Sequence, residues 1–284
     1  MAVKALAPPK SKTALAEQLG VTRSALYYAP KLPGKDLALK ARIEQVMSDH
    51  RAYGHRRLAL HLGINKKRVR RVMKLYGLKV KRRRQAPKKP QDLGQTALAI
   101  PNLVSGLTIE TVHQVWASDF TYLPYFGRWL YLATVEDIFT RQVLGWALAT
   151  RRSADLVSLA LLEAVCFHPI PNLIHSDQGS EYRSQEYLNL LKSLAIKPSM
   201  SQKASPWQNG YQESFYSGFK LELGYPEIYP DLGELIEAIA GQIHYYNHRR
   251  IHTALKCPPT VFAQRLNYQN NQLINREIMK GQSV

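Results

Sequence analysis

The feature that most constrains the fold of this chain is a change of hydrophobic pattern near residue 112. From there, apolar, β-branched and aromatic runs separated by turns predict three consecutive strands, at 112–120, 129–135 and 142–149. They are followed by a predicted helix after Ser153 to about Phe167, a strand at 172–175, a helix at 184–194 and a strand at 196–200. This order predicts an α/β fold in which a mixed sheet carries helices on its faces.

Three acidic residues occupy distinctive places in this order of elements. Asp119 and Asp177 are predicted at the ends of the first and fourth strands, and Glu213 lies on a later helix with 35 residues between it and Asp177. Ligands of such sheets gather at the carboxyl ends of strands, so the two aspartates lie side by side if their strands are neighbours. Three carboxylates from two strands and a helix can hold two divalent cations about 4 Å apart, which promotes in-line displacement at phosphorus. These residues are the candidate catalytic and metal-binding groups.

Several short motifs carry a resemblance to a known family. They are Trp116-x-x-Asp119-x-Thr121-Tyr122, His175-Ser-Asp177-x-Gly179-x-x-Tyr182, Asn209-Gly-x-x-Glu213-Ser-Phe215, Phe219-Lys220-x-Glu222, Tyr53-Gly-x-Arg56-Arg57 and Tyr246-Asn247-x-x-Arg250-x-His252-x-x-Leu255-x-x-x-Pro259. From about Lys12 to Gln264 the chain resembles the OrfB-type DDE transposases of bacterial insertion sequences, whose ribonuclease-H-like core is similar to that of retroviral integrases. The resemblance implies a DNA transposase that binds the ends of its element, cuts DNA by metal-assisted hydrolysis and joins 3′-hydroxyls by strand transfer. The zinc module of the retroviral enzymes is absent, since neither cysteine lies in the N-terminal third.

The resemblance also implies a role for each acidic residue. Asp119 would bridge two Mg²⁺ ions, with Asp177 on one ion and Glu213 on the other, and Mn²⁺ is expected to substitute for Mg²⁺. Asn209, Glu213 and Lys220 share one face of the predicted helix. We therefore expect Asn209 and Lys220 to contact DNA beside the metal ions.

Other acidic residues near these motifs are expected to have different roles. Glu136 and Asp137 are predicted as turn and ion-pair residues, with Arg141 nearby. Glu181 is predicted to be solvated or paired with Arg183.

The net charge of +18 is concentrated in the first third of the chain. Up to Asp92 there are 24 Lys and Arg against 5 Asp and Glu, a net charge of +19, whereas the remaining residues carry 15 against 16. A basic segment joined to a near-neutral globular one predicts an arm that binds a polyanion and delivers it to a catalytic body. A merely solvated basic surface is the alternative.

The basic arm is predicted to contain two helical units and a linker. Residues 1–36 predict a helix-turn-helix-like DNA-binding unit, and residues 37–78 a second helical DNA-binding unit whose last helix begins after Asn65 with an apolar stripe and a basic face. Residues 79–110 predict a basic linker that follows the phosphate backbone without reading bases. The predicted DNA contacts of the arm are Arg23, Arg56, Arg57, Lys66, Lys67, Arg68, Arg70, Arg71, Lys81, Arg82, Arg83 and Arg84.

The remaining boundaries place an integrase-like catalytic core at 111–225 and a C-terminal helical extension and tail at 226–284. Asp231 and Glu234 predict a capped helix that runs to about Tyr246, followed by a basic, aromatic turn in which Arg250 is the predicted DNA contact. The two cysteines are too few for a disulfide framework or a four-ligand zinc site, and Cys166 is expected in a helix core. The chain has no apolar run of about 20 residues and no secretory signal, so we expect a soluble cytoplasmic protein associated with the nucleoid.

The expected partner is double-stranded DNA, both the terminal inverted repeats of the element and the target. Further copies of the chain are expected as well, in a dimer or larger assembly on DNA, and a protein from an upstream reading frame is another candidate partner. Two alternatives stay open. One is a non-catalytic DNA-binding regulator, against which the intact Asp-Asp-Glu set argues; the other is a nuclease that hydrolyses without joining, against which the two recognition units argue.

Overall fold

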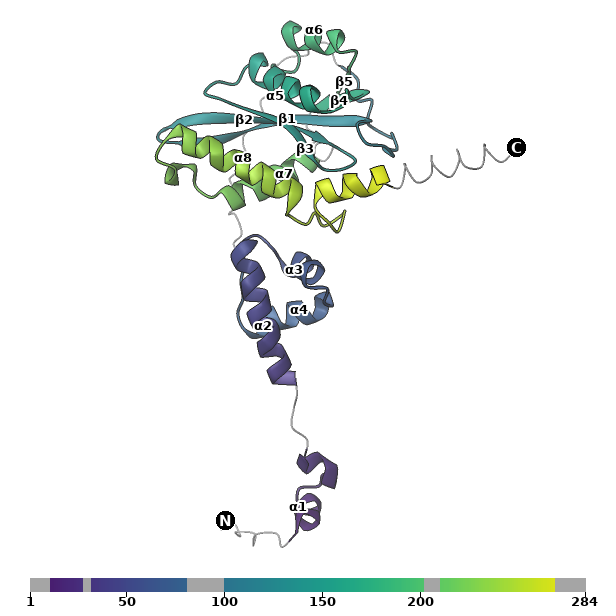
Figure 1. Cartoon of the computed structure of the whole chain (residues 1–284), viewed down its shortest axis with the longest axis vertical. Helices are drawn as coiled ribbons and strands as arrows, with labels where there is room; N and C mark the ends of the chain where they lie inside the picture. The colour runs from purple at the N-terminus through teal and green to yellow at the C-terminus, as the bar shows by residue number, and fades with distance from the viewer. Residues whose placement is uncertain (1–10, 28–31, 81–99, 202–209, 269–284) are drawn as a thin grey trace, which may run out of the picture.

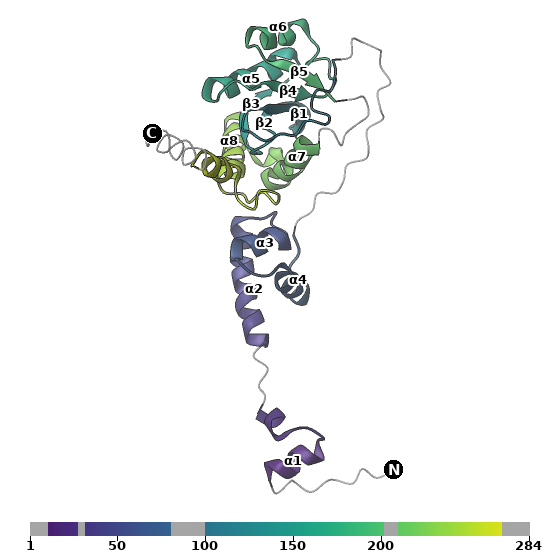
Figure 2. The same cartoon turned by 90° about the vertical axis from the view of Figure 1, so that its right-hand side faces the viewer.

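The computed structural model describes residues 11–27, 32–80, 100–201 and 210–268. An α/β body built around one sheet lies at one end of the molecule, and a separate helical unit lies next to it (Figure 1). A view turned by 90° shows the same order, with the N-terminal helix at the far end (Figure 2). In the described ranges no helix has both the length and the apolar character needed to cross a bilayer.

The body contains the predicted mixed sheet. Its strands are β1 (Val115–Tyr125), β2 (Arg128–Asp137), β3 (Val143–Ala149), β4 (Leu173–Ser176) and β5 (Lys197–Met200), in the order β3-β2-β1-β4-β5. The pairs β1–β2 and β2–β3 are antiparallel, and the pairs β1–β4 and β4–β5 are parallel. The predicted mixed sheet is therefore confirmed.

Helices cover both faces of the sheet (Figure 1). Helices α5 (Ala154–Phe167) and α6 (Gln185–Ser193) lie on one face, and α7 (Gly210–Leu223) and α8 (Leu232–His248) on the other. Ser153, Ser184 and Asp231 cap α5, α6 and α8 by accepting a backbone N–H of the first turn. Helix α8 packs on the same apolar cluster as α7, so the predicted boundary at 225 separates two parts of a single body. A short 3₁₀ turn, η3 (Pro226–Ile228), connects them.

Each face of the sheet has its own hydrophobic core. Trp116, Leu156 and Leu161 belong to the cluster under α5, and Leu132 and Ile239 to the cluster under α7 and α8. Full burial of one such side chain stabilises the fold by about 1.5–3 kcal/mol.

Helix α5 approaches β3 closely at Gly145. A Cβ added at this glycine would lie 2.6 Å from Ala164 N and closer still to the carbonyl oxygen of Ala160. Cys166, which was predicted in the core of this helix, is exposed instead.

The helical unit consists of α2 (Leu32–Asp49), α3 (His55–Leu62) and α4 (Lys66–Leu75), which pack around Ile43, Leu58, Val69 and Val72. The predicted boundary between residues 36 and 37 is wrong, because it falls inside α2. Further toward the N-terminus lie α1 (Lys12–Gln18) and η1 (Arg23–Tyr27); the second helix of the predicted N-terminal pair is thus a single 3₁₀ turn.

The helical unit contacts the body at the last turn of α8 and just after it. The N–H of Ile251 donates to the Tyr53 hydroxyl at 2.7 Å, and Ile251 packs on the helical unit's core. His50 Nδ1 and the Tyr245 hydroxyl form a second hydrogen bond of 2.7 Å.

Residues 100–110 pack on the body and do not extend away from it. Ile100 contacts the cluster under α5, and the N–H of Leu103 donates to Ser199 Oγ on β5 at 2.9 Å. The end of the predicted 79–110 linker therefore belongs to the body, and 81–99 lie outside the described residues.

Candidate active site

Asp119 and Asp177 lie next to each other because β1 and β4 run parallel. The register pairs Ala117 with His175, and each aspartate comes two residues later. The condition set in the sequence analysis, that the first and fourth strands be neighbours, is thus met. The predicted strand end at Asp119 is wrong, because β1 continues to Tyr125 in antiparallel pairing with β2. Only the parallel pairing of β1 with β4 ends before Asp119.

Two buried hydrogen bonds fix helix α7 against β1. The Gln212 side-chain amide donates to the carbonyl oxygen of Ala117 at 2.8 Å. One turn later, the Tyr216 hydroxyl donates to the carbonyl oxygen of Asp119 at 2.6 Å. Glu213 follows Gln212 directly, and its side chain is exposed. The helix that carries the third acidic residue is therefore anchored at the backbone of the first.

Asp119 lies within electrostatic reach of both other carboxylates. The pKa of Asp119 is raised to about 8, first by burial and then by the negative charges of Asp177 and Glu213. Two groups oppose this change: the N–H of Phe120, which donates to Asp119 Oδ1 at 2.8 Å, and the ammonium of Lys220. The negative charge at Asp119 is thus only partly balanced by the protein.

A fourth carboxylate, which the sequence did not identify as part of the site, flanks Asp177. Burial raises the pKa of Asp177, and the charge of Glu181 raises it as well. Gly179 passes between the two side chains: its N–H donates to Asp177 Oδ1 at 2.9 Å, and an added Cβ would lie 2.9 Å from an oxygen of each carboxylate. Glu181 is buried and paired with Arg152, so the predicted solvated side chain or pairing with Arg183 is wrong. Arg152 therefore holds Glu181 beside Asp177.

The donor chemistry of Asp119, Asp177 and Glu213 fits a divalent cation. Carboxylate oxygens are the ligands that Mg²⁺ prefers, and a cation would balance the charge that raises the pKa of both aspartates. As placed, however, no three His, Cys, Asp or Glu side chains in the described part of the chain form a group that could hold a metal ion.

The raised pKa of Asp119 predicts a stabilising substitution in the absence of metal. Because its folded-state pKa of about 8 lies above the ordinary 3.8, the folded protein retains this proton. The stability that the folded protein gains by retaining this proton is fully present below pH 4 and is lost as the pH rises through 8. At pH 8 in EDTA, we expect Asp119→Asn to raise the melting temperature by about 3 °C or more. Differential scanning fluorimetry at pH 5 and pH 8 measures this.

Glu237→Gln is the matched control, because Glu237 is exposed on α8 and should melt like the wild type at both pH values. The comparison between variants matters more than the pH profile itself, since buried Glu136, whose pKa is also raised to about 8, contributes to that profile. An Asp119→Asn protein that melts below the wild type at pH 8 contradicts the electrostatic account.

His175, in the motif that contains Asp177, has a structural position. Burial lowers its pKa to about 4, so the imidazole is neutral near pH 7. Its Nδ1 bonds Ser199 Oγ at 3.0 Å, and the same oxygen accepts the N–H of Leu103. The histidine therefore helps to join β4, β5 and the 100–104 segment.

Glu136 and Asp137 are buried at the end of β2, not placed in a turn as predicted. Asp137 accepts the N–H of Thr140 at 2.6 Å and that of His113 at 2.7 Å, which closes the connection after β2. Burial raises the pKa of Glu136 to about 8, and the charge of Arg141 opposes this change. The predicted proximity of Arg141 is thus correct, whereas the predicted position in a turn is wrong.

Some of the predicted DNA-contacting residues are placed to reach DNA. The exposed ones are Arg23, Arg56, Lys66, Lys67, Arg70 and Arg71. Lys220 lies near the site, with its ammonium 4.6 Å from the centre of the Tyr122 ring. Outside the described residues are Lys81, Arg82, Arg83, Arg84 and Asn209.

Two of the predicted contacts form ion pairs within the protein. Both terminal nitrogens of Arg71 bond the carboxylate of Asp36, at 2.6 and 2.7 Å. Arg250 is 6% exposed and donates to Glu222 at 2.8 Å. Arg57 and Arg68 are partly buried. In this conformation the guanidinium of Arg250 is not at the surface, so the structure does not support its predicted contact with phosphate.

Comparisons with known proteins find similarity to integrase core domains and to transposases of bacterial insertion sequences. Two family models described as "Integrase core domain" match residues 110–206 and 194–259. The chain is 37% identical over 227 residues to the transposase for insertion sequence element IS904 of Lactococcus lactis, a match that covers 76% of this chain and 89% of the relative. It is 35% identical over 255 residues to the putative transposase InsK for insertion sequence element IS150 of Escherichia coli, covering 83% and 87%. A solved structure with some similarity is the HTLV-2 integrase catalytic core domain in complex with magnesium, at 21% identity and a TM-score of 0.42, covering 53% of this chain and 95% of that one.

Proposed function

This chain belongs to the OrfB-type DDE transposases of bacterial insertion sequences and has a ribonuclease-H-like core; on that premise, we propose that it binds the ends of its element and catalyses DNA cleavage and strand transfer through Asp119, Asp177 and Glu213. Membership of this family makes it a DNA transposition protein of the polynucleotidyl transferase type. What we propose beyond this is that it binds element ends, cleaves and joins DNA, and uses these three residues to do so.

The observation that carries the proposal is the convergence of negative charge on Asp119 of β1, from Asp177 just after β4 and from Glu213 on α7. The negative charges of Asp177 and Glu213 both act on Asp119, which is itself partly buried. A protein interior tolerates such a concentration of negative charge poorly unless a cation or a proton balances it. The ammonium of Lys220 balances only part of this negative charge, so a divalent cation can balance the rest.

Each residue of the site has a proposed role. Asp119 would contact two Mg²⁺ ions, Asp177 one of them and Glu213 the other; when bound, the ions promote deprotonation of the attacking hydroxyl and stabilise the leaving oxygen. Gln212 and Tyr216 hold α7 in place, so that Glu213 is presented near β1. The Arg152–Glu181 pair limits the positions that the Asp177 carboxylate can take on its Gly179 side.

The proposal also includes an assembly of two or more copies on DNA. Joining needs two element ends held together, and one set of three carboxylates acts on one strand at a time. Two copies, each acting on one end, meet this need with a symmetric arrangement. The net charge of +19 over the first 92 residues opposes association of the free protein until DNA neutralises it.

A strand-transfer assay tests the function directly. Full-length protein is incubated with labelled duplexes that carry candidate element ends and with a supercoiled target plasmid. We expect joined products with Mg²⁺ or Mn²⁺, none with EDTA or Ca²⁺ alone, and products in which two ends enter one target.

The products separate the alternatives. Nicked ends that never join would support a nuclease, and end binding without any cleavage would support a non-catalytic regulator; either result overturns the proposal. Joining that remains in EDTA would contradict the proposed use of metal.

A further inference from the structure

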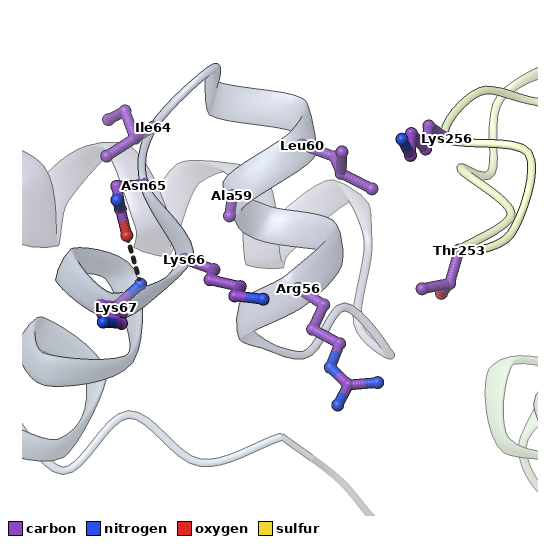
Figure 3. A pocket seen from close by; sticks show the side chains of 9 residues that line it. All are labelled: Arg56, Ala59, Leu60, Ile64, Asn65, Lys66, Lys67, Thr253 and Lys256. Carbon is purple, nitrogen blue, oxygen red and sulfur yellow. Dashed lines mark hydrogen bonds between the residues drawn. The ribbon is translucent and has the colours of Figure 1, made fainter.

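A basic cleft lies between the helical unit and the loop that follows α8 (Figure 3). Its volume is about 470 Å³. On one side α3 and the start of α4 contribute Arg56, Leu60 and Lys66, and on the other side the loop contributes Thr253 and Lys256. The cleft is therefore lined by two segments that are far apart in the sequence.

The charge of the lining is entirely positive. Its cationic residues are Arg56, Lys66, Lys67 and Lys256, all of them exposed, and no Asp or Glu lines the cleft. Within the described part of the chain, none of the four takes part in an ion pair. Four cations gathered in one concavity repel one another, so this arrangement favours an anionic occupant.

Neutral groups complete the lining in a way that suits a sugar-phosphate chain. Ala59, Leu60 and Ile64 supply an apolar surface on the helical side, against which a deoxyribose can pack. The Thr253 hydroxyl is a neutral donor opposite Arg56. A guanidinium binds two phosphate oxygens at once, whereas lysine ammonium groups act as point charges along the same strand.

The loop that carries Thr253 and Lys256 is held in a defined shape. The N–H of His252 donates to the carbonyl oxygen of Cys257 at 3.0 Å, and the N–H of Lys256 donates to that of His252 at 2.8 Å. Lys256 has a φ of 61°, in the left-handed region. The nearby bond from Ile251 to Tyr53 fixes this loop to the helical unit.

We propose that this cleft binds the phosphate backbone of a DNA strand, so that one stretch of DNA is held by the helical unit and the catalytic body together. The proposal rests on the proposed function, which makes DNA the substrate, and it assigns DNA contacts to Thr253 and Lys256. Contacts of this kind carry no base specificity. Their effect is to fix the orientation of the helical unit relative to the site that cuts the strand.

The test compares charge removal on the two sides of the cleft. Lys256→Asn removes the ammonium while keeping a residue that tolerates a positive φ, and Lys66→Gln removes one from α4. Fluorescence anisotropy with the full-length protein and a labelled 30-base-pair duplex, measured from 50 to 300 mM KCl, gives affinity and its salt dependence. Each variant is expected to bind about 5-fold more weakly at 150 mM salt and to lower the slope of log K against log salt by about 0.9.

Lys192→Gln is the matched control, because Lys192 is an exposed cation on α6, across the sheet from the cleft. It loses the same charge and should keep the wild-type salt slope. Lys256→Arg should keep wild-type affinity, and melting temperatures of all variants should agree, which excludes loss of the fold as the cause.

The outcomes keep this inference apart from the proposed function. If Lys256→Asn binds duplex like the wild type while the wild type performs strand transfer, the cleft is not a DNA site and the function stands. If both cleft variants weaken binding but the wild type never joins DNA, the cleft assignment stands and the function is wrong. If Lys192→Gln weakens duplex binding as much as the cleft variants do, the effect comes from net charge alone and the inference is wrong.

Discussion

Asp119→Asn is expected to abolish both cleavage and joining of DNA, and Asp177→Asn and Glu213→Gln are expected to do the same. Each change keeps the size of the side chain but removes one of three negative charges that act together. Without one of them, the remaining groups hold two divalent ions poorly, and the hydroxyl nucleophile is left at its ordinary reactivity. We expect a loss of roughly a thousandfold or more in the rate of strand transfer.

The strand-transfer assay and duplex binding should be measured on the same preparations. DNA affinity should stay within about 2-fold of the wild type, because the predicted DNA contacts lie mainly in the basic arm. Glu186→Gln, at an exposed position on α6, is the matched control and should retain full activity. A variant of the three that still joins DNA at more than a tenth of the wild-type rate removes its residue from the proposed site.

Arg250→Met is expected to destabilise the protein by about 3–5 kcal/mol, the usual cost of leaving a buried charge without its partner. The Arg250 guanidinium and the Glu222 carboxylate are each 6% exposed, and they are joined by a bond of 2.8 Å. Gln242 donates to the other oxygen of Glu222 at 2.8 Å, but it brings no positive charge. Urea denaturation followed by circular dichroism gives the free energy of unfolding.

A second substitution separates the buried pair from a surface role. Glu222→Gln combined with Arg250→Met removes both charges, so the double variant should recover at least half of the stability that Arg250→Met loses. If Arg250→Met instead unfolds like the wild type and binds DNA more weakly, the DNA contact predicted from the sequence is right and the structural role assigned here is wrong.

Local signals in the sequence predicted most of the elements correctly. The hydroxyls of Ser153 and Ser184 cap the helices they were expected to start. The parallel pairing that brings Asp119 near Asp177 does not follow from such local signals and is seen only in the sheet. Caps and periodic apolar runs act over a few residues, so they can be recognised in a single sequence.

Partners that are distant in the chain could not be predicted in this way. Arg71 looked like a phosphate contact because its neighbours on α4 are basic, but its partner Asp36 lies on another helix. The pairing of Arg152 with Glu181 gave no local signal for the same reason. Charge patterns in a sequence report composition, and only the packing of elements decides which cations remain exposed.

The position of Asp119 inside a long strand limits how this chain can change in length. Side chains alternate between the two faces of a sheet; Leu123 and Tyr125 belong to the core under α7 and α8, whereas Trp116 belongs to the core under α5. Loss or gain of a single residue between Trp116 and Asp119 would therefore turn the carboxylate toward α5, away from Glu213. Length variation of this kind is tolerable in the hairpin beyond Tyr125, where it leaves the parallel register of β1 and β4 intact.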